Sequence, residues 1–177
     1  MSAVVLLPNA AAPEVALLAP SLAQRAAPGS AAGIRVLHAD GQVRRWARDE
    51  VLAVLSLEAS SVADAQAGVA KLRQRISPAE LDLAWDLTAD QATGTGELAQ
   101  LMLGAQSPAD RDAVLVAVAW SGLGFRLERG QVHRCNAEQR AAQAERRARA
   151  ESVAAELAPW LAHVDAVRAG LSRPPPP

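Results

Sequence analysis

The sequence predicts an α+β protein, mostly α, with a small β-barrel-like module, a winged helix (three helices plus a β-hairpin) and a long C-terminal helix. The change in hydrophobic spacing along the chain predicts this order. Apolar residues alternate with polar ones before Ser60, recur every three to four residues beyond it, and alternate again after Gly124. Three helices followed by two short strands around a glycine turn give the element order of a winged helix.

Composition limits the functions that the chain can perform. Its 177 residues allow one ordinary domain or two small ones, and half of them are hydrophobic, although many are alanines that each bury little area. The formal net charge of -1 excludes a protein whose bulk charge alone holds nucleic acid. Arginine supplies all 18 basic residues except Lys71, which together with abundant alanine indicates a GC-rich genome more than a phosphate-binding surface.

The start of the chain and its cysteine content bear on location. Residues 3–7 are apolar, but Pro8 interrupts them and no basic residue precedes them. This run is too short to span a membrane and lacks the basic flank of a secretory signal. Cys135 is the single cysteine, so no disulfide framework is expected. These features predict a cytoplasmic protein without a membrane partner.

Residues 1–57 are predicted to form the β-module. Alternating apolar residues flank Asp40-Gly41, which predicts a hairpin with a two-residue turn. The first 33 residues are rich in Ala and Pro, and outside two short apolar runs they are expected to be irregular. The segments expected in strands are residues 4–7, 15–18, 34–46 and 51–55.

Residues 58–135 are predicted to form the winged-helix domain. Serine before proline starts two of its helices, at Ser77-Pro78 and Ser107-Pro108, because serine caps free backbone N–H groups and proline fits the first helical position. An earlier helix begins at Ser60 or Ser61. Its apolar face consists of Val62, Ala65, Val69, Leu72 and Ile76.

The last helix before the hairpin, residues 109–120, has acids at its start and almost no polar face. A helix that reads DNA bases in the major groove needs polar side chains on its exposed face. We therefore expect this helix to be buried between others, and sequence-specific DNA recognition is disfavoured. The hairpin that follows turns at Glu128-Arg-Gly130.

Residues 136–171 predict a long kinked helix that begins after Asn136. It has few large apolar residues in its first half and is supported by pairs such as Glu145 with Arg149. Pro159 should kink or restart it. Residues 172–177 form a Pro-rich tail. The second half of the helix has an apolar stripe of Val153, Leu157, Trp160, Leu161, Val164 and Val167.

No catalytic constellation, metal site or cofactor site emerges from the sequence. His38, His133 and His163 lie far apart in different elements, and none stands at metal-ligand spacing with Cys135. Acids that recur every four residues are expected to form a solvated helix face. These acids are Asp82, Asp86 and Asp90.

Basic residues concentrate in two places. Seven arginines and only three glutamates lie between Arg126 and Arg149, so the hairpin and the next helix are net positive and suited to a phosphate backbone. Alternatively, they form an ordinary solvated surface. A second cluster surrounds Trp46, whose ring could stack on single-stranded bases or anchor the core of its module. The candidate nucleic-acid-binding residues are Arg44, Arg45, Trp46, Arg126, Arg129, Arg134 and Arg140.

Residues 34–171 resemble the N-terminal region of the ribonuclease II (RNB) exoribonucleases, especially their cyanobacterial and chloroplast-like branch. The resemblance begins upstream at residues 36–46, which look like the barrel hairpin that precedes the wing in that family. The motifs that support it are Asp82-Leu-Ala-Trp-Asp-Leu87, Glu97-Leu-Ala-Gln-Leu-Met-Leu-Gly104, Ser107-Pro108, Gly124-Phe-Arg-Leu-Glu-Arg-Gly130 and the helix after Asn136.

The resemblance implies a non-catalytic, RNA-binding accessory region. In that family, barrel and winged-helix modules precede a catalytic domain that degrades RNA from its 3′ end with magnesium. None of the family's catalytic aspartates has a counterpart here, and the catalytic domain would begin where this sequence ends, so activity is expected to require an RNB catalytic polypeptide. The expected partners are single-stranded RNA and that polypeptide. The alternative is a protein-interaction adapter that binds no nucleic acid and docks a partner on its apolar stripe.

Overall fold

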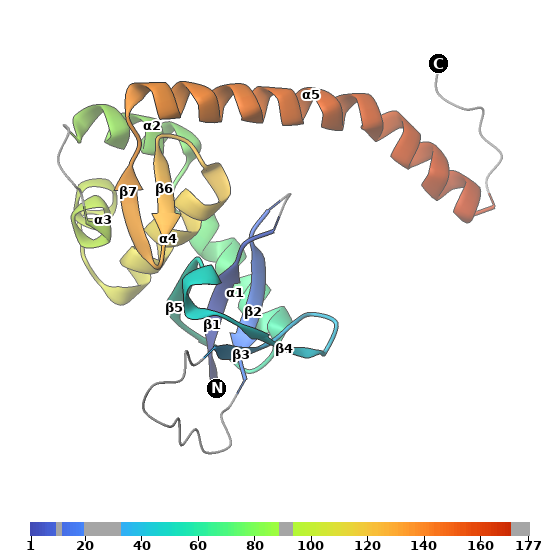
Figure 1. Cartoon of the computed structure of the whole chain (residues 1–177), viewed down its shortest axis with the longest axis horizontal. Helices are drawn as coiled ribbons and strands as arrows, with labels where there is room; N and C mark the ends of the chain where they lie inside the picture. The colour runs from blue at the N-terminus through green and yellow to red at the C-terminus, as the bar shows by residue number, and fades with distance from the viewer. Residues whose placement is uncertain (10–11, 20–32, 89–93, 171–177) are drawn as a thin grey trace. The chain divides into compact units, whose positions relative to one another are not determined.

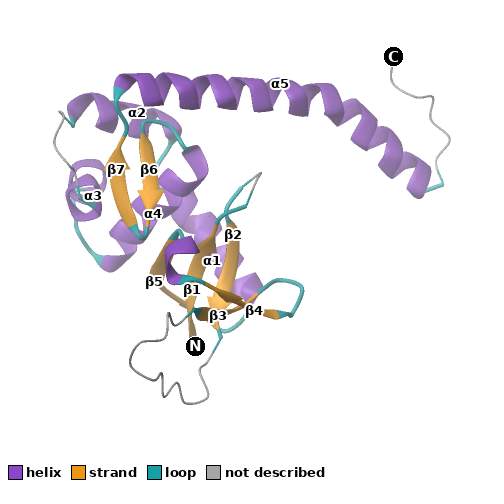
Figure 2. Ribbon diagram, in the orientation of Figure 1, coloured by secondary structure: helices purple, strands orange, loops and turns teal. Residues whose placement is uncertain are grey.

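The computed structural model describes residues 1–9, 12–19, 33–88 and 94–170, which form an α+β protein with a long C-terminal helix (Figures 1 and 2). Asp90 and the Pro-rich tail, which the sequence analysis singled out, lie outside these residues. The chain divides into two compact units, Met1–Asn136 and Ala137–Pro177, and each is described by itself below.

The first unit contains a five-stranded antiparallel sheet in the order β4-β3-β2-β1-β5. A single turn of 3₁₀ helix, η1, lies between β4 and β5. Strands β1 and β2 coincide with the two short apolar runs in which strands were expected, residues 4–7 and 15–18, and they include some of the most buried residues of the protein. The elements are β1 (Ser2–Leu7), β2 (Glu14–Leu18), β3 (Ile34–Leu37), β4 (Val43–Trp46), η1 (Arg48–Glu50) and β5 (Ala53–Ala59).

The β3–β4 connection differs from the expected two-residue turn. The amide of His38 donates to the carbonyl of Gln42 at 2.9 Å, which leaves three residues in the loop. The third of them, Gly41, has a φ of 76°, and the amide of Gly41 donates to the carbonyl of His38. A turn followed by a left-handed residue is the usual three-residue hairpin, so glycine is correctly placed but the loop is one residue longer than predicted.

The two faces of this sheet bury their side chains in different clusters. Because alternate residues of a strand point to opposite faces, β1 contributes to both and is covered on each side. On one face Val4, Leu6, Val15, Leu17 and Leu55 join the core that the helices share. On the other face the cluster consists of Val5, Leu7, Ala16, Val36 and Val51, with Leu18, Ile34 and Trp46 against it.

Four helices follow the sheet, and their starts confirm the capping predictions. The hydroxyls of Ser61, Ser77 and Ser107 each accept a backbone N–H from the third residue of the helix. Proline occupies the first turn of the second and fourth helices. The helices are α1 (Val62–Arg73), α2 (Pro78–Leu87), α3 (Thr95–Leu103) and α4 (Pro108–Ser121).

Helix α4 is the buried centre of this unit, as its apolar sequence predicts. All of its side chains from Asp112 to Val118 are buried, and several belong to the same cluster as the inner residues of β1 and β5. The carboxylate of Asp112 accepts the backbone N–H groups of Ser56 and Leu57 at 3.1 and 3.0 Å, and the Ser56 hydroxyl at 2.6 Å. The modules expected on either side of residue 57 therefore share one core.

A β-hairpin of β6 (Phe125–Glu128) and β7 (Gln131–Arg134) completes the unit. Phe125 is buried in the helical core, and Gly124 lies so close to Trp85 that an added Cβ would stand 2.7 Å from its ring. The hairpin turns at Arg129-Gly130, and the amide of Gly130 donates to the carbonyl of Leu52 at 2.8 Å. This bond fixes the hairpin tip against the start of β5.

The second unit is one helix, α5 (Ala137–Arg168). It passes through Pro159 without a break and bends in its second half (Figure 1), so the predicted helix continues and does not restart. None of its residues is buried, and the predicted apolar stripe is exposed. Among the described residues, no helix combines the length and the hydrophobicity that a membrane crossing requires.

Candidate nucleic-acid interface

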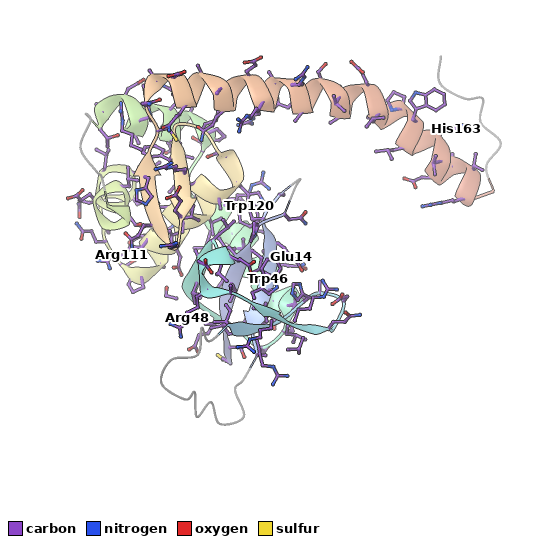
Figure 3. All side chains as sticks on the ribbon, in the orientation of Figure 1. Glu14, Trp46, Arg48, Arg111, Trp120 and His163 are labelled. Carbon is purple, nitrogen blue, oxygen red and sulfur yellow. The ribbon has the colours of Figure 1, made fainter. Side chains whose placement is uncertain are left out.

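Trp46 lies in the interior of the β-module. Its indole N–H donates to His38 Nε2 at 3.1 Å, and the two rings stack with their centroids 6.1 Å apart. Because His38 Nε2 accepts this bond, the ring proton resides on Nδ1, which donates to the carboxylate of Glu14 at 2.6 Å. His38 is buried, and its two bonds join Glu14 of β2 and Trp46 of β4, which are labelled in Figure 3, through the residue that follows β3. This geometry favours the core-anchor interpretation of Trp46 over a free stacking platform.

Arg44 and Arg45 occupy the exposed edge strand β4 and point to opposite faces of the sheet. Arg44 forms an ion pair with Asp40 at 2.5 Å, which neutralises it locally. Arg45 stands directly opposite Arg35 of β3, an arrangement of like charges that disfavours strand pairing. Charged residues on an edge strand also prevent pairing with other chains, so these two arginines have a structural role that needs no ligand.

Arg134 is engaged within the fold. Its guanidinium lies 4.1 Å from the centre of the Trp85 ring, and its Nε and Nη2 donate to the Trp85 carbonyl at 3.2 and 3.1 Å. Trp85 in turn donates its indole N–H to the carbonyl of Cys135 at 2.9 Å. Arg134 thus joins β7 to the C-terminal end of α2, where a cation is favoured by the helix dipole.

The two candidate arginines Arg126 and Arg140 belong to other elements than β4 and β7. Arg126 is exposed on β6 and pairs with Glu128 at 3.4 Å. Arg140 belongs to α5, in the second unit, and forms contacts of its own. Within the first unit, the predicted arginines lie on three separate parts of the fold, which are β4, the β6–β7 strands and the turn between β6 and β7.

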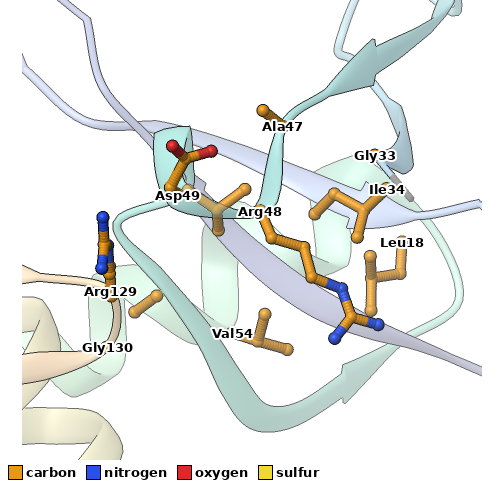
Figure 4. Close-up of a pocket in the computed structure, with 11 residues that line it drawn as sticks. Leu18, Gly33, Ile34, Ala47, Arg48, Asp49, Val54, Arg129 and Gly130 are labelled. Carbon is orange, nitrogen blue, oxygen red and sulfur yellow. The ribbon is translucent and has the colours of Figure 1, made fainter. Parts of the chain in front are cut away.

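Arg129, however, shares a surface groove with Arg48, an arginine outside the predicted set. Both line a groove of about 920 Å³ on the first unit, bounded by η1 and by the hairpin turn (Figure 4). Arg48 extends toward Leu18 and Val54, and Arg129 stands with Gly130 at the other end of the groove. The lining residues are Leu18, Gly33, Ile34, Ala47, Arg48, Asp49, Val51, Ala53, Val54, Arg129 and Gly130.

The electrostatics of this groove favour an anion. In the described part of the chain, neither Arg48 nor Arg129 forms an ion pair with a carboxylate, although Asp49 also lines the groove. The floor between them is apolar, with Leu18, Ile34 and Val54. Two exposed guanidinium groups over an apolar floor can bind phosphates and stack on flat rings.

The backbone of Arg129 is unusual for its residue type. Its φ is 51° and that of Gly130 is 75°, so both central residues of the hairpin turn are left-handed. Turns of this geometry prefer Asn-Gly or Asp-Gly. In the left-handed region Cβ lies too close to the following carbonyl oxygen, and the short polar side chains of Asn and Asp offset this cost by hydrogen bonding locally. Arginine at this position is therefore less stable than asparagine would be.

Sequence reasoning identified Arg129 but did not place Arg48 with it. Arg48 follows the Trp46 cluster in sequence, yet its separation from Arg129 is about eighty residues along the printed chain, and no periodic signal links the two. The hydrogen bond between the amide of Gly130 and the carbonyl of Leu52 joins the hairpin tip to this part of the sheet.

The described residues give no indication of metal or nucleophile chemistry. No three His, Cys, Asp or Glu side chains gather among them in a way that could hold a metal ion. Cys135, the single thiol, is buried beneath the hairpin. Comparison with protein-family models, with curated proteins and with solved structures finds no match for the chain.

Proposed function

We propose that residues 1–136 form a non-catalytic module that binds single-stranded RNA, equivalent to the N-terminal region of a ribonuclease II-like 3′-5′ exoribonuclease. The antiparallel five-stranded sheet, with β4 and β5 at its edges, stands where the small barrel precedes the winged helix in that family. The succession of α2, α3, α4 and the β6–β7 hairpin supports a winged helix. Degradation of the bound strand would be the task of an RNB catalytic domain.

The observation that carries this proposal is the groove between η1 and the hairpin turn. Its two arginines, Arg48 and Arg129, can each fork onto a phosphate, and its apolar floor can receive the faces of bases. The strained backbone of Arg129 supports the same interpretation, because a turn under no functional demand would not favour arginine.

Single-stranded RNA fits this site better than duplex DNA. Base readout in a duplex needs an exposed helix or ribbon in the major groove, and α4, the helix in the recognition position, is buried. A net charge of -1 also argues against nonspecific duplex binding by the whole molecule. A single strand needs only a few phosphate contacts together with stacking.

A fluorescence-anisotropy titration of the whole chain with labelled oligouridylate of about twelve nucleotides at low salt tests the proposal. The test variant combines Arg48→Gln with Arg129→Asn, which removes both charges and gives the turn a residue that it accommodates. A hydrogen bond to a charged group contributes about 1.5–3 kcal/mol, so we expect at least a tenfold loss of affinity.

The matched control combines Arg44→Gln with Arg45→Gln, which removes the same charge from the edge strand β4 without touching the groove. We expect this control to bind RNA within about threefold of the native protein, the difference being long-range charge alone. Absence of binding by the native protein, or an equal loss in both variants, would refute a site in this groove.

The alternative function, a protein-interaction adapter, is supported by one feature of α5. Its exposed stripe includes Leu157, Trp160, Leu161 and Val164, each 43–63% exposed, at the spacing of a helix–helix seam. An adapter of this kind would bind no RNA in the titration above, so that experiment also separates the two functions.

A further inference from the structure

A second hollow, of about 540 Å³, adjoins the groove on the same unit. The two share Val54 and Gly130 as lining residues, so the surface between them passes over the β5 side chain of Val54 and beside the hairpin turn. Val54 is 50% exposed, and an added Cβ on Gly130 would meet nothing within 4 Å. The passage from one hollow to the other is therefore open and partly apolar.

Arg111 is the basic residue of the second hollow (Figure 3). It is exposed in the first turn of α4, and its guanidinium extends to Gly96 at the start of α3, where an added Cβ would lie 3.6 Å from Nε and 3.7 Å from Nη2. These are ordinary van der Waals distances, so the Arg111 side chain lies alongside Gly96 among the residues that line the hollow.

The acids that flank Arg111 in sequence have hydrogen-bond partners within the fold, and Asp112 lines the hollow together with its partner Ser56. Asp110 pairs with Arg75 at 2.6 Å and accepts the hydroxyl of Ser107, while Asp112 accepts three hydrogen bonds from Ser56 and Leu57. In the described part of the chain, Arg111 forms no ion pair. Its charge is available for an external anion.

The hydroxyl of Thr95 adds a second polar group to the same hollow. Its oxygen is shielded from solvent and has no hydrogen-bond partner among the residues that the structure describes. A buried hydroxyl without a partner is costly, and an oxygen-rich ligand beside Arg111 would satisfy it. The carboxylate nearest in sequence, Glu97, accepts the backbone N–H of Gly94 at 3.1 Å and is thereby held at the cap of α3.

We propose that an RNA strand held at Arg48 and Arg129 continues over Val54, past the hairpin turn, to Arg111, which holds a further phosphate of the same strand. This inference rests on the proposed function. It extends the proposed binding surface beyond the groove and adds a distal phosphate contact at Arg111. A short oligonucleotide would occupy the groove only, and a longer one would reach Arg111.

The test compares Arg111→Gln with the native chain on two labelled oligouridylates, of about four and about twelve nucleotides, in the same titration. We expect Arg111→Gln to lose about tenfold in affinity for the longer strand, the equivalent of one charge-assisted hydrogen bond, and less than about twofold for the shorter. Arg73→Gln, an exposed arginine near the end of α1 that lines neither hollow, is the matched control.

Each outcome decides a different question. If the native protein binds both strands and Arg111→Gln binds the longer one normally, the extended path is refuted and the groove site stands. If Arg111→Gln weakens both strands equally, Arg111 is not a distal contact and the path is again refuted. If the native protein binds neither strand, the proposed function fails together with this inference. Thermal unfolding monitored by circular dichroism establishes that the variant is folded.

Discussion

At the scale of single residues, Arg129 combines a conformational cost with an exposed charge. Its left-handed backbone is tolerated better by asparagine, whose short polar side chain bonds locally. Arginine therefore opposes the stability of the hairpin turn at the position where it faces the groove. Since asparagine would suit this turn position better, we expect the arginine side chain to serve binding.

We predict that Arg129→Asn alone stabilises the protein by about 0.5–1 kcal/mol, because it removes strain at a left-handed position. The same variant should bind single-stranded RNA more weakly. Urea unfolding and the anisotropy titration measure the two effects on one sample. Unchanged RNA affinity in a stabilised variant would show that the arginine has no role in binding.

Single residues also show the limits of prediction from sequence. Arg134 and Arg129 belong to the same hairpin and looked equivalent, but Arg134 lies on Trp85, which is far away in sequence, and is held by its carbonyl. Stacking between residues so distant in sequence leaves no local pattern. Trp46 likewise had two interpretations, and only its hydrogen bond to His38 favours one of them.

At the scale of elements, Asp112 attaches helix α4 to the edge of the sheet. Strand β5 is an edge strand, and its free N–H groups at Ser56 and Leu57 would be open to pairing with another chain. The buried carboxylate of Asp112 accepts both, together with the Ser56 hydroxyl. One side chain thus closes the edge and fixes the helix.

We predict that Asp112→Ala lowers the free energy of unfolding by about 2–4 kcal/mol, because it leaves several donors without an acceptor. The control is Glu58→Ala, an exposed acid on the same strand, which should change stability by less than about 0.5 kcal/mol. Urea unfolding followed by circular dichroism measures both. Equal effects would mean that Asp112 does not join these elements.

The helix caps give the protein a pH dependence. The hydroxyl of Ser107 and then the guanidinium of Arg75 hold the pKa of Asp110 below its ordinary value. The backbone N–H and then the hydroxyl of Ser77 lower the pKa of Glu80 in the same way. A carboxyl group whose pKa is lower in the folded protein than in the unfolded protein stabilises the fold at pH values above its unfolded-state pKa. This stabilisation is lost as the pH falls through its folded-state pKa.

We therefore predict that the contribution of these two carboxyl groups to stability against urea is constant from about pH 7 to pH 5. This contribution should decrease below about pH 4, where the pH enters and then passes below the ordinary range of carboxyl pKa values. Ser107→Ala removes the hydroxyl that contributes most to the shift at Asp110. Its unfolding midpoint should decrease less between pH 5 and pH 3 than that of the native protein. A decrease of the same size would assign the acid sensitivity to other groups.

The elements that sequence predicted best are those with local signals. Ser-Pro starts located α2 and α4, and the apolar composition of α4 predicted its burial. The β3–β4 loop was predicted one residue too short, because Asp-Gly fits more than one turn and the register is set by the strands on either side. Strands β1 and β2 were partly obscured by the Ala- and Pro-rich sequence around them.

At the scale of the whole molecule, the chain is close to neutral, so any affinity for RNA must come from a local arrangement of charge. The groove provides this arrangement, since Arg48 and Arg129, which are about eighty residues apart in sequence, line its two ends on either side of apolar residues. The arginines of α5 belong to a separate unit. Binding through few phosphates predicts a modest dependence on salt.

The salt dependence of RNA affinity tests the central claim most directly. For single strands, the slope of log affinity against log salt is about -0.7 per neutralised phosphate. We predict that the Arg48→Gln, Arg129→Asn variant has a slope shallower than that of the native protein by about 1.4, since two phosphate contacts are lost. Equal slopes for the two proteins would contradict the claim that these arginines contact the RNA backbone.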